Sequence, residues 1–425
     1  MTDRNDTPIS MTRRAVLAAM AGGAATLAGC GGGAGGGADA SAAPGGGGAV
    51  AAPGDFGTTT TSVAGISSGG TGSFATGVVT GLGSIILRGI RYDDSTARVD
   101  RDDDGVVGAV LPGMVVSVRG SSIVAASGAD ALPTATAMRI CYASEWVGKV
   151  DAVDTANRTL TVLGQRIDVA NAIFDGDALQ LSAVTTSVYV EVHGYLDLST
   201  GRLLATRVEV STTAPAAFRL SGLVSGLDTN ARTFRIGTAL IAYDATLPLP
   251  LVWSNGQQVR VTLAPSQAAG TWQATRIRQR ELVLPELQVE DHSEAEVEGT
   301  VTSVAGANAF TVNGITIDAS AASIVGALVV GTTVEVHGTA VNGVIVATRV
   351  EIKTLAQVTQ DFEFIGTVSN LNILTRTFSV KGVDFTYGLN ARIDVLGWLT
   401  GATPLVRVKA TQVNGVWVAS EVRQA

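Results

Sequence analysis

Apolar and polar residues alternate with a period of two along most of the chain beyond residue 74. In Val190-Glu191-Val192-His193, for example, the valines point to one face of a strand and the polar pair points to the other. The segment 204–209 alternates in the same way. Nowhere does an apolar stripe recur every three to four residues, as an amphipathic helix requires. The pattern predicts short, half-buried β-strands and an all-β fold.

The alternation belongs to five copies of one gapped pattern. Each copy opens with a glycine and a hydrophobic strand, and these glycines follow one another at intervals of 67 to 77 residues: Gly77, Gly148, Gly222, Gly299 and Gly366. A polar turn, a second and a third strand, about 12 to 20 irregular residues, and a fourth and fifth strand follow. The fourth strand reads VEVHG at both 190–194 and 334–338, two copies apart. A period this long predicts an array of small domains and not a solenoid.

Five short strands within about 70 residues favour a small barrel, and a long connection after the third strand matches the order of the OB-fold. An open five-stranded meander or a small sandwich is the competing geometry. The sequence therefore predicts a tandem array of five small five-stranded OB-like barrels, with the boundaries 74–144, 145–213, 218–284, 295–354 and 362–425. Because each unit is small, we expect neighbouring copies to share packing.

The N-terminal residues predict export and lipid anchoring. Arg13 and Arg14 precede a short uncharged apolar run, as in a signal peptide covering 1–30, and they also resemble a twin-arginine export signal. Leu27-Ala28-Gly29-Cys30 resembles a lipobox, in which Cys30 is lipidated and becomes the new N-terminus. An ordinary cleaved signal with an incidental cysteine is the alternative. Residues 31–73 are rich in Gly, Ala, Ser and Thr and predict a disordered tether with a reach of roughly 35 Å.

The motifs resemble a bacterial family of unknown function that occurs as tandem β-repeats in exported and lipid-anchored proteins. The resemblance depends on the Gly-x-Val start, the Thr-Phe-x-Val second strand at Thr377, the fourth strand Gly-x-x-Val-x-Val-x-Gly, and the Ala-Thr-Arg-Val ending. It is clearest at 148–210 and 299–352, and Leu263 and Ala410 depart from it where a glycine follows the fourth strand. The resemblance implies an architecture and a compartment but no catalytic residues. With Gly31 after the cysteine, it implies the outer membrane of a Gram-negative bacterium.

One acidic stretch, Asp100-Arg101-Asp102-Asp103-Asp104-Gly105, repeats the start of a calcium loop. Position twelve is Leu111 where such a loop has a bidentate Glu, so a solvated acidic turn is the alternative. Calcium held by Asp100, Asp102 and Asp104 is the one cofactor that the sequence suggests.

Two tryptophans, Trp272 and Trp417, precede the closing motif by two residues, where Leu203 and Ile345 stand in other units. Their indoles could contact a glycan, since OB barrels bind oligosaccharides. Core packing is the competing interpretation, because aliphatic residues fill the same slot elsewhere.

The remaining chemistry-bearing residues are few. His193, His292 and His337 lack the converging ligands of a metal site and are expected on polar faces or in a linker. Cys141 is expected to pack as a small hydrophobe. Charged residues make up 16% of the chain and the net charge is −8, with no basic stripe, which argues against a nucleic-acid partner.

Without a nucleophile elbow, phosphate loop or HExxH motif, we expect a non-enzymatic lipid-anchored envelope protein. Its barrels would serve structure or interaction, with the membrane reached through the N-terminal lipid. A carbohydrate- or matrix-binding lipoprotein that uses surface aromatics is the second hypothesis. An envelope protein or a polysaccharide is then the expected partner.

Overall fold

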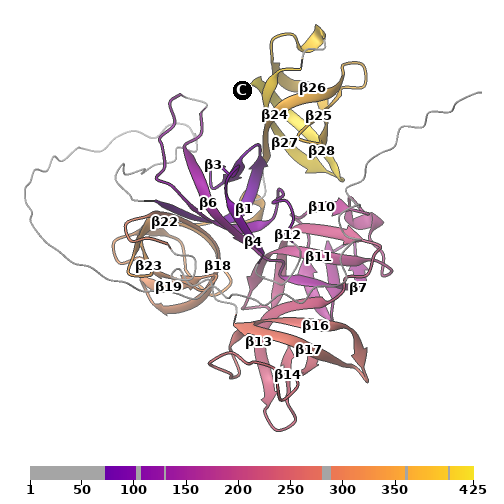
Figure 1. Cartoon of the computed structure of the whole chain (residues 1–425), viewed down its shortest axis with the longest axis vertical. Coiled ribbons are helices and arrows are strands. Elements are labelled where there is room, and N and C mark those ends of the chain that lie inside the picture. Colours follow the sequence, from indigo (N-terminus) through magenta and orange to yellow (C-terminus); the bar gives the residue numbers. More distant parts are fainter. Residues whose placement is uncertain (1–71, 102–106, 129–130, 280–288, 359–361, 401–402) are drawn as a thin grey trace, which may run out of the picture. The chain divides into compact units, whose positions relative to one another are not determined.

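The computed structural model describes residues 72–101, 107–128, 131–279, 289–358, 362–400 and 403–425. They form five small closed β-barrels in chain order (Figure 1). The predicted signal peptide, with Arg13, Arg14 and Cys30, and nearly all of the predicted tether lie outside the described residues. Among the residues that are described, no helix has the length and apolar character needed to cross a bilayer.

The strands of barrels 1 to 3 are short and mostly half-buried. Barrel 1 contains β1 (Ser73–Leu82), β2 (Ile85–Leu87), β3 (Ile90–Asp93), β4 (Arg98–Arg101), β5 (Val115–Gly120) and β6 (Thr134–Tyr142). Barrel 2 contains β7 (Trp146–Asp154), β8 (Thr159–Val162), β9 (Gln165–Asp168), β10 (Ile173–Gly176), η2 (Leu181–Ala183), β11 (Tyr189–Asp197) and β12 (Arg202–Ser211). Barrel 3 contains β13 (Phe218–Asp228), β14 (Thr233–Ile236), β15 (Ala239–Ala242), β16 (Gln258–Ala268) and β17 (Thr271–Gln279).

Barrels 4 and 5 follow the same plan. Barrel 4 contains β18 (Glu294–Gly306), β19 (Ala309–Val312), β20 (Ile315–Asp318), β21 (Ser323–Val325), β22 (Thr333–Val341) and β23 (Val344–Ile352), followed by the one-turn helix α1 (Leu355–Val358). Barrel 5 contains β24 (Phe362–Asn372), β25 (Thr377–Val380), β26 (Val383–Asp394), η3 (Trp398–Thr400), β27 (Leu405–Val413) and β28 (Val416–Gln424).

The strand order within each barrel is OB-like, as the sequence predicts. In barrel 2, β7, β8 and β9 form a meander, and β9 then pairs in parallel with β12. The fourth strand, β11, lies antiparallel between β12 and β7 and closes the barrel. The other four barrels repeat these pairings, so the closed barrel is correct and the open meander and the sandwich are not.

The connection after the third strand is more ordered than the irregular segment that we expect from sequence. In barrels 1, 2 and 4 it contains a short extra strand, β4, β10 or β21, which pairs in parallel with the fifth strand. The reason is the length of the fifth strand. In barrel 2, β9 pairs only with Leu203 and Leu204 of β12, so the backbone of 207–210 needs another partner, which β10 provides.

The glycine that opens each copy removes a side chain where the hairpin of strands two and three crosses the first strand. A Cβ added to Gly222 would lie 2.3 Å from Cγ2 of Ile236, and one added to Gly299 would lie 2.1 Å from Nδ2 of Asn313. Real Cβ atoms do not come this close to another atom, so any other residue would require the side chain of Ile236 or Asn313 to move. The repeated glycine therefore has a packing role.

The motif VEVHG ends in a β-bulge. The register between β11 and β12 shifts at His193 and Gly194, and a Cβ on Gly194 would lie 2.1 Å from the carbonyl oxygen of Leu204. All five barrels have a shift at this point of the fourth strand. Barrels 3 and 5 make it with Leu263 and Ala410. The bulge is thus common to the design, while the glycine is one way of making it.

The turns between the first and second strands of barrels 2, 3 and 5 are closed by Asp and Asn side chains. Oδ1 of Asp154 accepts a hydrogen bond from the backbone N–H of Asn157 at 2.9 Å. Oδ1 of Asp228 accepts from two backbone N–H groups at 2.9 Å each, and Oδ1 of Asn372 does the same at 3.0 and 3.1 Å. Asp and Asn favour such turns because their side chains bond to the backbone two or three residues further on.

The first strands of different barrels pair with one another. Ser73–Thr76 of β1 pair in parallel with Glu294–Val297 of β18, so one sheet continues from barrel 1 into barrel 4. The other end of β1 pairs with β24 of barrel 5, and β7 meets β13 where Val147 faces Arg219. The barrels are therefore joined by backbone hydrogen bonds between units that are far apart in sequence.

The apolar cores largely follow the barrels. Barrels 1, 4 and 5 each have a cluster formed mainly by their own residues, although Phe74 of barrel 1 joins that of barrel 4 and Ile173 of barrel 2 joins that of barrel 5. The buried residues of barrels 2 and 3 form one continuous cluster. Trp146 lies at that seam, where its indole N–H donates to the buried carbonyl oxygen of Ser221 at 2.9 Å. Barrels 2 and 3 are accordingly one packed body.

Candidate functional site

A cleft of about 350 Å³ lies where barrels 2 and 3 meet. Its lining comes from strands and turns of both barrels: Lys149, Asp151, Leu163, Gly164 and Tyr189 from barrel 2, and Phe218, Thr238, Ala239, Leu240, Pro265, Gln267, Gly270 and Trp272 from barrel 3. The shared core beneath the cleft fixes the two halves relative to each other. Its volume falls in the range of sites that bind small molecules.

One wall of the cleft is aromatic. The ring of Tyr189 lies 6.2 Å from the ring of Phe218, and Phe218 meets Trp272 edge to face at 5.6 Å. Phe218 is buried and Trp272 is 9% exposed, while Tyr189 is half-buried. A ligand would therefore meet the ring of Tyr189 and one edge of the Trp272 indole.

Polar groups lie beside the aromatic residues, since Lys149 of β7 is the cross-strand partner of Tyr189, and hydrogen bonds hold this rim in place. Oδ2 of Asp151 accepts from the backbone N–H of Gly164 at 2.8 Å, and the hydroxyl of Thr238 donates to the carbonyl oxygen of Gly164 at 2.8 Å. Exposed Lys149 and Asp151 stand two residues apart on β7, so their side chains point to the same face. The cleft thus combines an aromatic surface with one cationic and one anionic group.

Trp417 occupies in barrel 5 the slot that Trp272 fills in barrel 3. It packs edge to face against Phe362 at 5.2 Å and Phe364 at 5.0 Å. Each Trp therefore meets a Phe located four residues before the opening glycine, and the same positions hold Ser144 with Leu203 in barrel 2 and Ala295 with Ile345 in barrel 4. The pairing of sizes shows that both indoles fill space in a core. Contact of Trp272 or Trp417 with a glycan stays a prediction, and only Trp272 lines the cleft described above.

The acidic stretch is described only in part. Asp100 lies on β4 and accepts from Nε of Arg139 at 2.7 Å and from Nε of Arg98 at 2.9 Å. Partial burial raises the pKa of Asp100, but the hydrogen bonds from Arg139 and Arg98 outweigh it, so the pKa is below its usual value. Asp102 and Asp104 lie outside the described residues. A calcium ion would have to displace two guanidinium groups from Asp100.

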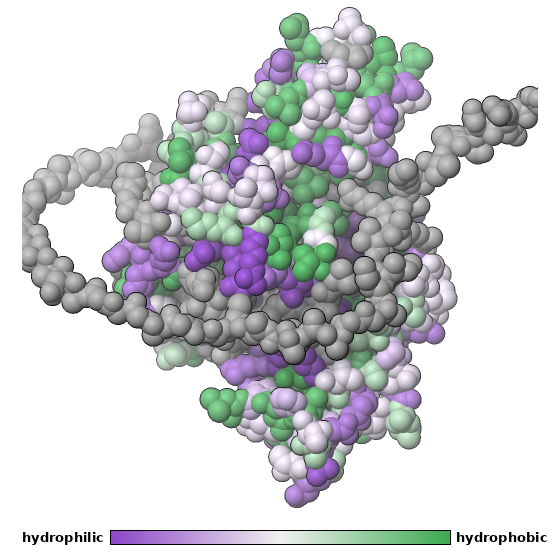
Figure 2. All heavy atoms as spheres, viewed as in Figure 1, coloured by the Kyte–Doolittle hydropathy of each residue, from purple (hydrophilic) through white to green (hydrophobic). Residues whose placement is uncertain are grey.

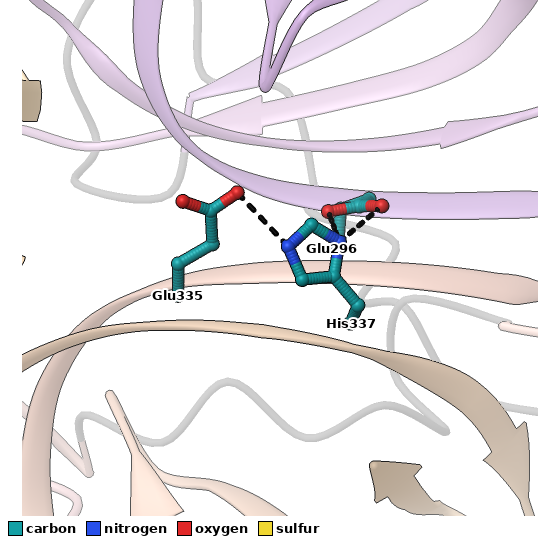
Figure 3. A group of neighbouring side chains, drawn as sticks. All are labelled: Glu296, Glu335 and His337. Carbon is teal, nitrogen blue, oxygen red and sulfur yellow. Dashed lines mark hydrogen bonds and ion pairs between the residues drawn. The ribbon is translucent and has the colours of Figure 1, made fainter. Parts of the chain in front are cut away.

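A cluster of Glu296, Glu335 and His337 lies in barrel 4, on β18 and β22 (Figure 3). The imidazole stands between the two carboxylates, with Nδ1 2.7 Å from Glu296 and Nε2 3.1 Å from Glu335. Glu335 also pairs with the guanidinium group of Arg88 from barrel 1 and with the ammonium group of Lys353 at 3.1 Å. Because cations of the protein already occupy Glu335, the cluster is an ion-pair network and not an open metal site.

His337 therefore lies on the polar face of its strand, as the sequence predicts, but that face is covered. The equivalent His193 is completely buried, with Nε2 3.6 Å from Glu191. His292 is exposed and has a positive φ of 66° in the segment before β18. Cys141 is half-buried and packs against the core of barrel 4, as a small hydrophobe does.

The sequence analysis does not predict the buried polar junction centred on Glu298. Its carboxylate is 1% exposed and accepts from the hydroxyl of Tyr195 at 2.7 Å and from the backbone N–H of Val78 at 3.2 Å. The guanidinium group of Arg88 is its ionic partner. Residues of barrels 1, 2 and 4 thus meet at one carboxylate.

Comparison with known proteins identifies a family for part of the chain. Residues 147–209 and 298–351 match the model of a domain of unknown function (DUF5666). These segments lie in barrels 2 and 4, where the resemblance read from the sequence is clearest, and together they cover less than half of the chain. Two segments of this chain are thus similar to that domain.

No curated protein matches the chain. Among solved structures, Drosophila Unr CSD456 is similar over 48% of this chain and 96% of that chain, with 14% sequence identity and a TM-score of 0.12. A TM-score this low carries no argument about function.

Proposed function

We propose that this protein is a non-enzymatic, lipid-anchored protein of the cell envelope whose barrels serve interaction, and that the cleft between barrels 2 and 3 binds a carbohydrate. The observation that supports the ligand class is the composition of the cleft. Aromatic rings beside a carboxylate and an ammonium group suit a sugar, because its C–H face packs on aromatic rings while its hydroxyl groups need hydrogen-bond partners.

The proposed location in the cell envelope rests on two features of the sequence. They are the predicted export signal around Arg13 and Arg14 and the predicted lipidation of Cys30. They fit an outer-membrane lipoprotein that meets envelope polysaccharide. A purely structural role is the second candidate. It is favoured by the pairing of β1 with β18 and β24, which joins barrels 1, 4 and 5 through their backbones.

The test of the binding site uses the full chain with Cys30→Ser, so that lipid plays no part. A glycan array screens for ligands, and titration calorimetry measures the affinity for each hit. We expect Asp151→Asn to weaken binding at least about tenfold without changing the melting temperature, because this change removes a rim acceptor and little packing.

Trp272→Leu and Trp417→Leu form a matched pair, because leucine occupies this slot in barrel 2. Both changes should lower stability by about 1–3 kcal/mol through lost packing. Only Trp272→Leu should weaken glycan binding. Equal loss of binding in both variants, or an array without any hit, would refute the assignment of the cleft.

The location is tested separately by labelling cells with a radioactive fatty acid and fractionating their membranes. Label in the envelope fraction that disappears with Cys30→Ser is the expected outcome. A soluble, unlabelled wild-type protein would contradict the anchoring.

A further inference from the structure

One end of barrel 5 displays large aliphatic side chains to solvent. Five of them form what we name the apolar tip: Ile373, Leu374, Leu389, Leu396 and Leu399. The four leucines are each more than three-quarters exposed, and Leu374 reaches 91%. Figure 2 shows the hydrophobic residues gathered on this barrel, at the top of the view. Exposed apolar groups at this density mark an interaction surface.

The pairings of the strands place the tip at a single end of the barrel. Thr367 of β24 faces Leu405 at the start of β27, so the turn after β24 and the loop before β27 lie at the same end. The backbone N–H of Tyr387 donates to the carbonyl oxygen of Arg376 at 3.1 Å, which brings the segment that carries Leu389 to that turn. At the opposite end, the hairpin of β27 and β28 packs on Leu179 of barrel 2.

The leucines stand on ordered backbone. Trp398, next to Leu399, is buried and packs edge to face on Phe378 at 5.1 Å, while its indole N–H donates to the hydroxyl of Tyr387 at 3.3 Å. The buried indole holds its loop to the barrel while the leucines on either side point outward. The exposure is thus a property of the folded barrel.

The turn that carries Ile373 and Leu374 has polar or small residues in the other barrels. It reads Asp-Thr-Ala-Asn-Arg-Thr in barrel 2, Asp-Thr-Asn-Ala-Arg-Thr in barrel 3 and Asn-Ile-Leu-Thr-Arg-Thr in barrel 5. The hydrogen bonds of the turn are the same in barrels 3 and 5. The turn forms without aliphatic residues at these two positions. We therefore attribute Ile373 and Leu374 to an interaction of the tip and not to folding.

We infer that the apolar tip inserts into the surface of a lipid bilayer. Leucines on protruding turns suit a fluid apolar medium better than the flat, complementary surface of a protein partner. Exposed Arg376 and Arg392 border the tip, and Arg392 lies 3.6 Å from both Asp394 and Glu421. Arginine side chains at the border of an inserted surface interact favourably with anionic headgroups.

The chain outside the described residues supports the choice of a bilayer. It contains Cys30, and a lipid there would hold the barrels within roughly 35 Å of the membrane on average. Only this argument of proximity rests on the proposed function. Insertion of the tip would give the protein a second membrane contact, distant in the sequence from Cys30.

The experiment measures flotation of the full chain carrying Cys30→Ser with vesicles of phosphatidylethanolamine and phosphatidylglycerol. We expect binding that Ile373→Thr with Leu374→Asn weakens about tenfold, since two aliphatic side chains leave the bilayer. These residues are the ones that barrel 3 carries, so the melting temperature should not change. Leu251→Asn is the control, because Leu251 is fully exposed on barrel 3 and its loss should leave binding unchanged.

Equal binding by the tip variant and the wild type would overturn the inference, as would equal loss in the Leu251 control. So would a wild-type chain that does not float but forms dimers in sedimentation velocity that the tip variant loses, since the tip would then bind a second copy. None of these outcomes bears on lipidation or on the glycan cleft, because the tested chain lacks the anchor and the cleft is intact. Failure of the tip is therefore distinct from failure of the proposed function.

Discussion

The hydrogen bond between Tyr195 and Glu298 offers the sharpest test of how the barrels are joined. The phenol of barrel 2 and the carboxylate of barrel 4 are both buried, and the oxygen atoms are 2.7 Å apart. Tyr195→Phe removes one hydroxyl group and leaves Arg88 and the N–H of Val78 as partners of the carboxylate. No charge is therefore left unpaired by the change.

A hydrogen bond to a charged acceptor contributes about 1.5–3 kcal/mol. We therefore expect Tyr195→Phe to lower the free energy of unfolding by about 2 kcal/mol. Tyr243→Phe in barrel 3 is the matched control, because that buried hydroxyl accepts only a 3.3 Å hydrogen bond from the neutral indole of Trp253. Its expected cost is about 1 kcal/mol or less.

The assay is urea denaturation of the full chain followed by circular dichroism, with Glu298→Gln completing a double-mutant cycle. Tyr195→Phe and Glu298→Gln should be non-additive by at least about 1 kcal/mol, while Tyr243→Phe and Glu298→Gln should add. If Tyr195→Phe costs no more than Tyr243→Phe and adds with Glu298→Gln, the junction does not exist in solution.

Three further predictions test the fold. Gly194→Ala should lower the free energy of unfolding by about 1–3 kcal/mol, because its Cβ would lie 2.1 Å from the carbonyl oxygen of Leu204. The control is Ala410→Gly at the same bulge in barrel 5, which should cost under about 1 kcal/mol. Equal costs of the two changes in chemical denaturation would contradict the steric reason. Burial, and then the charge of Glu298, raises the pKa of Tyr195 well above its usual value. Its contribution is therefore complete below about pH 10 and is lost as the pH rises further, so a melting-temperature series in alkali should fall less steeply for Tyr195→Phe than for wild type. The lowered pKa of Asp100 has the opposite sign: Asp100→Asn should cost about 1 kcal/mol at pH 7, and in melts from pH 7 to pH 2 this difference should vanish in acid, whereas a constant difference would show that the arginines do not hold the carboxylate.

The barrel could be predicted because local and repeated signals agree on it. Alternation at period two gives strands, the opening glycine marks the crossing of the hairpin, and Asp154, Asp228 and Asn372 close their turns as such residues do. The extra strand in the long connection was missed. This strand forms because the long fifth strand has backbone groups that need a partner. That requirement comes from the tertiary structure and leaves no local signal in the sequence.

The junctions between barrels could not be predicted from the sequence. Glu298 and His193 stand at outward positions of alternating strands, where charged and polar residues normally face water. Both are buried in the folded chain, and Glu298 is covered by Val78 of barrel 1 and Tyr195 of barrel 2. Nothing in one repeat specifies such a neighbour.

The cleft could be predicted from the sequence only in part. Trp272 attracts attention in the sequence, but Tyr189 and Phe218 become its neighbours only when two barrels meet. The apolar tip did leave a local signal, since Ile373 and Leu374 replace the Thr and Ala or Asn of the equivalent turns.

The double pairing of β1 has a mechanical consequence. Any pull on the N-terminal side of the chain reaches Ser73–Thr76 first, and these residues are held by β5 on one side and by β18 on the other. Hydrogen bonds in a ladder run across the strands, so the load is applied in shear to two ladders together and cannot unzip them one bond at a time. The first and the fourth barrel would therefore share the tension from the start. The strand on which a tether would pull is held by two ladders of backbone hydrogen bonds.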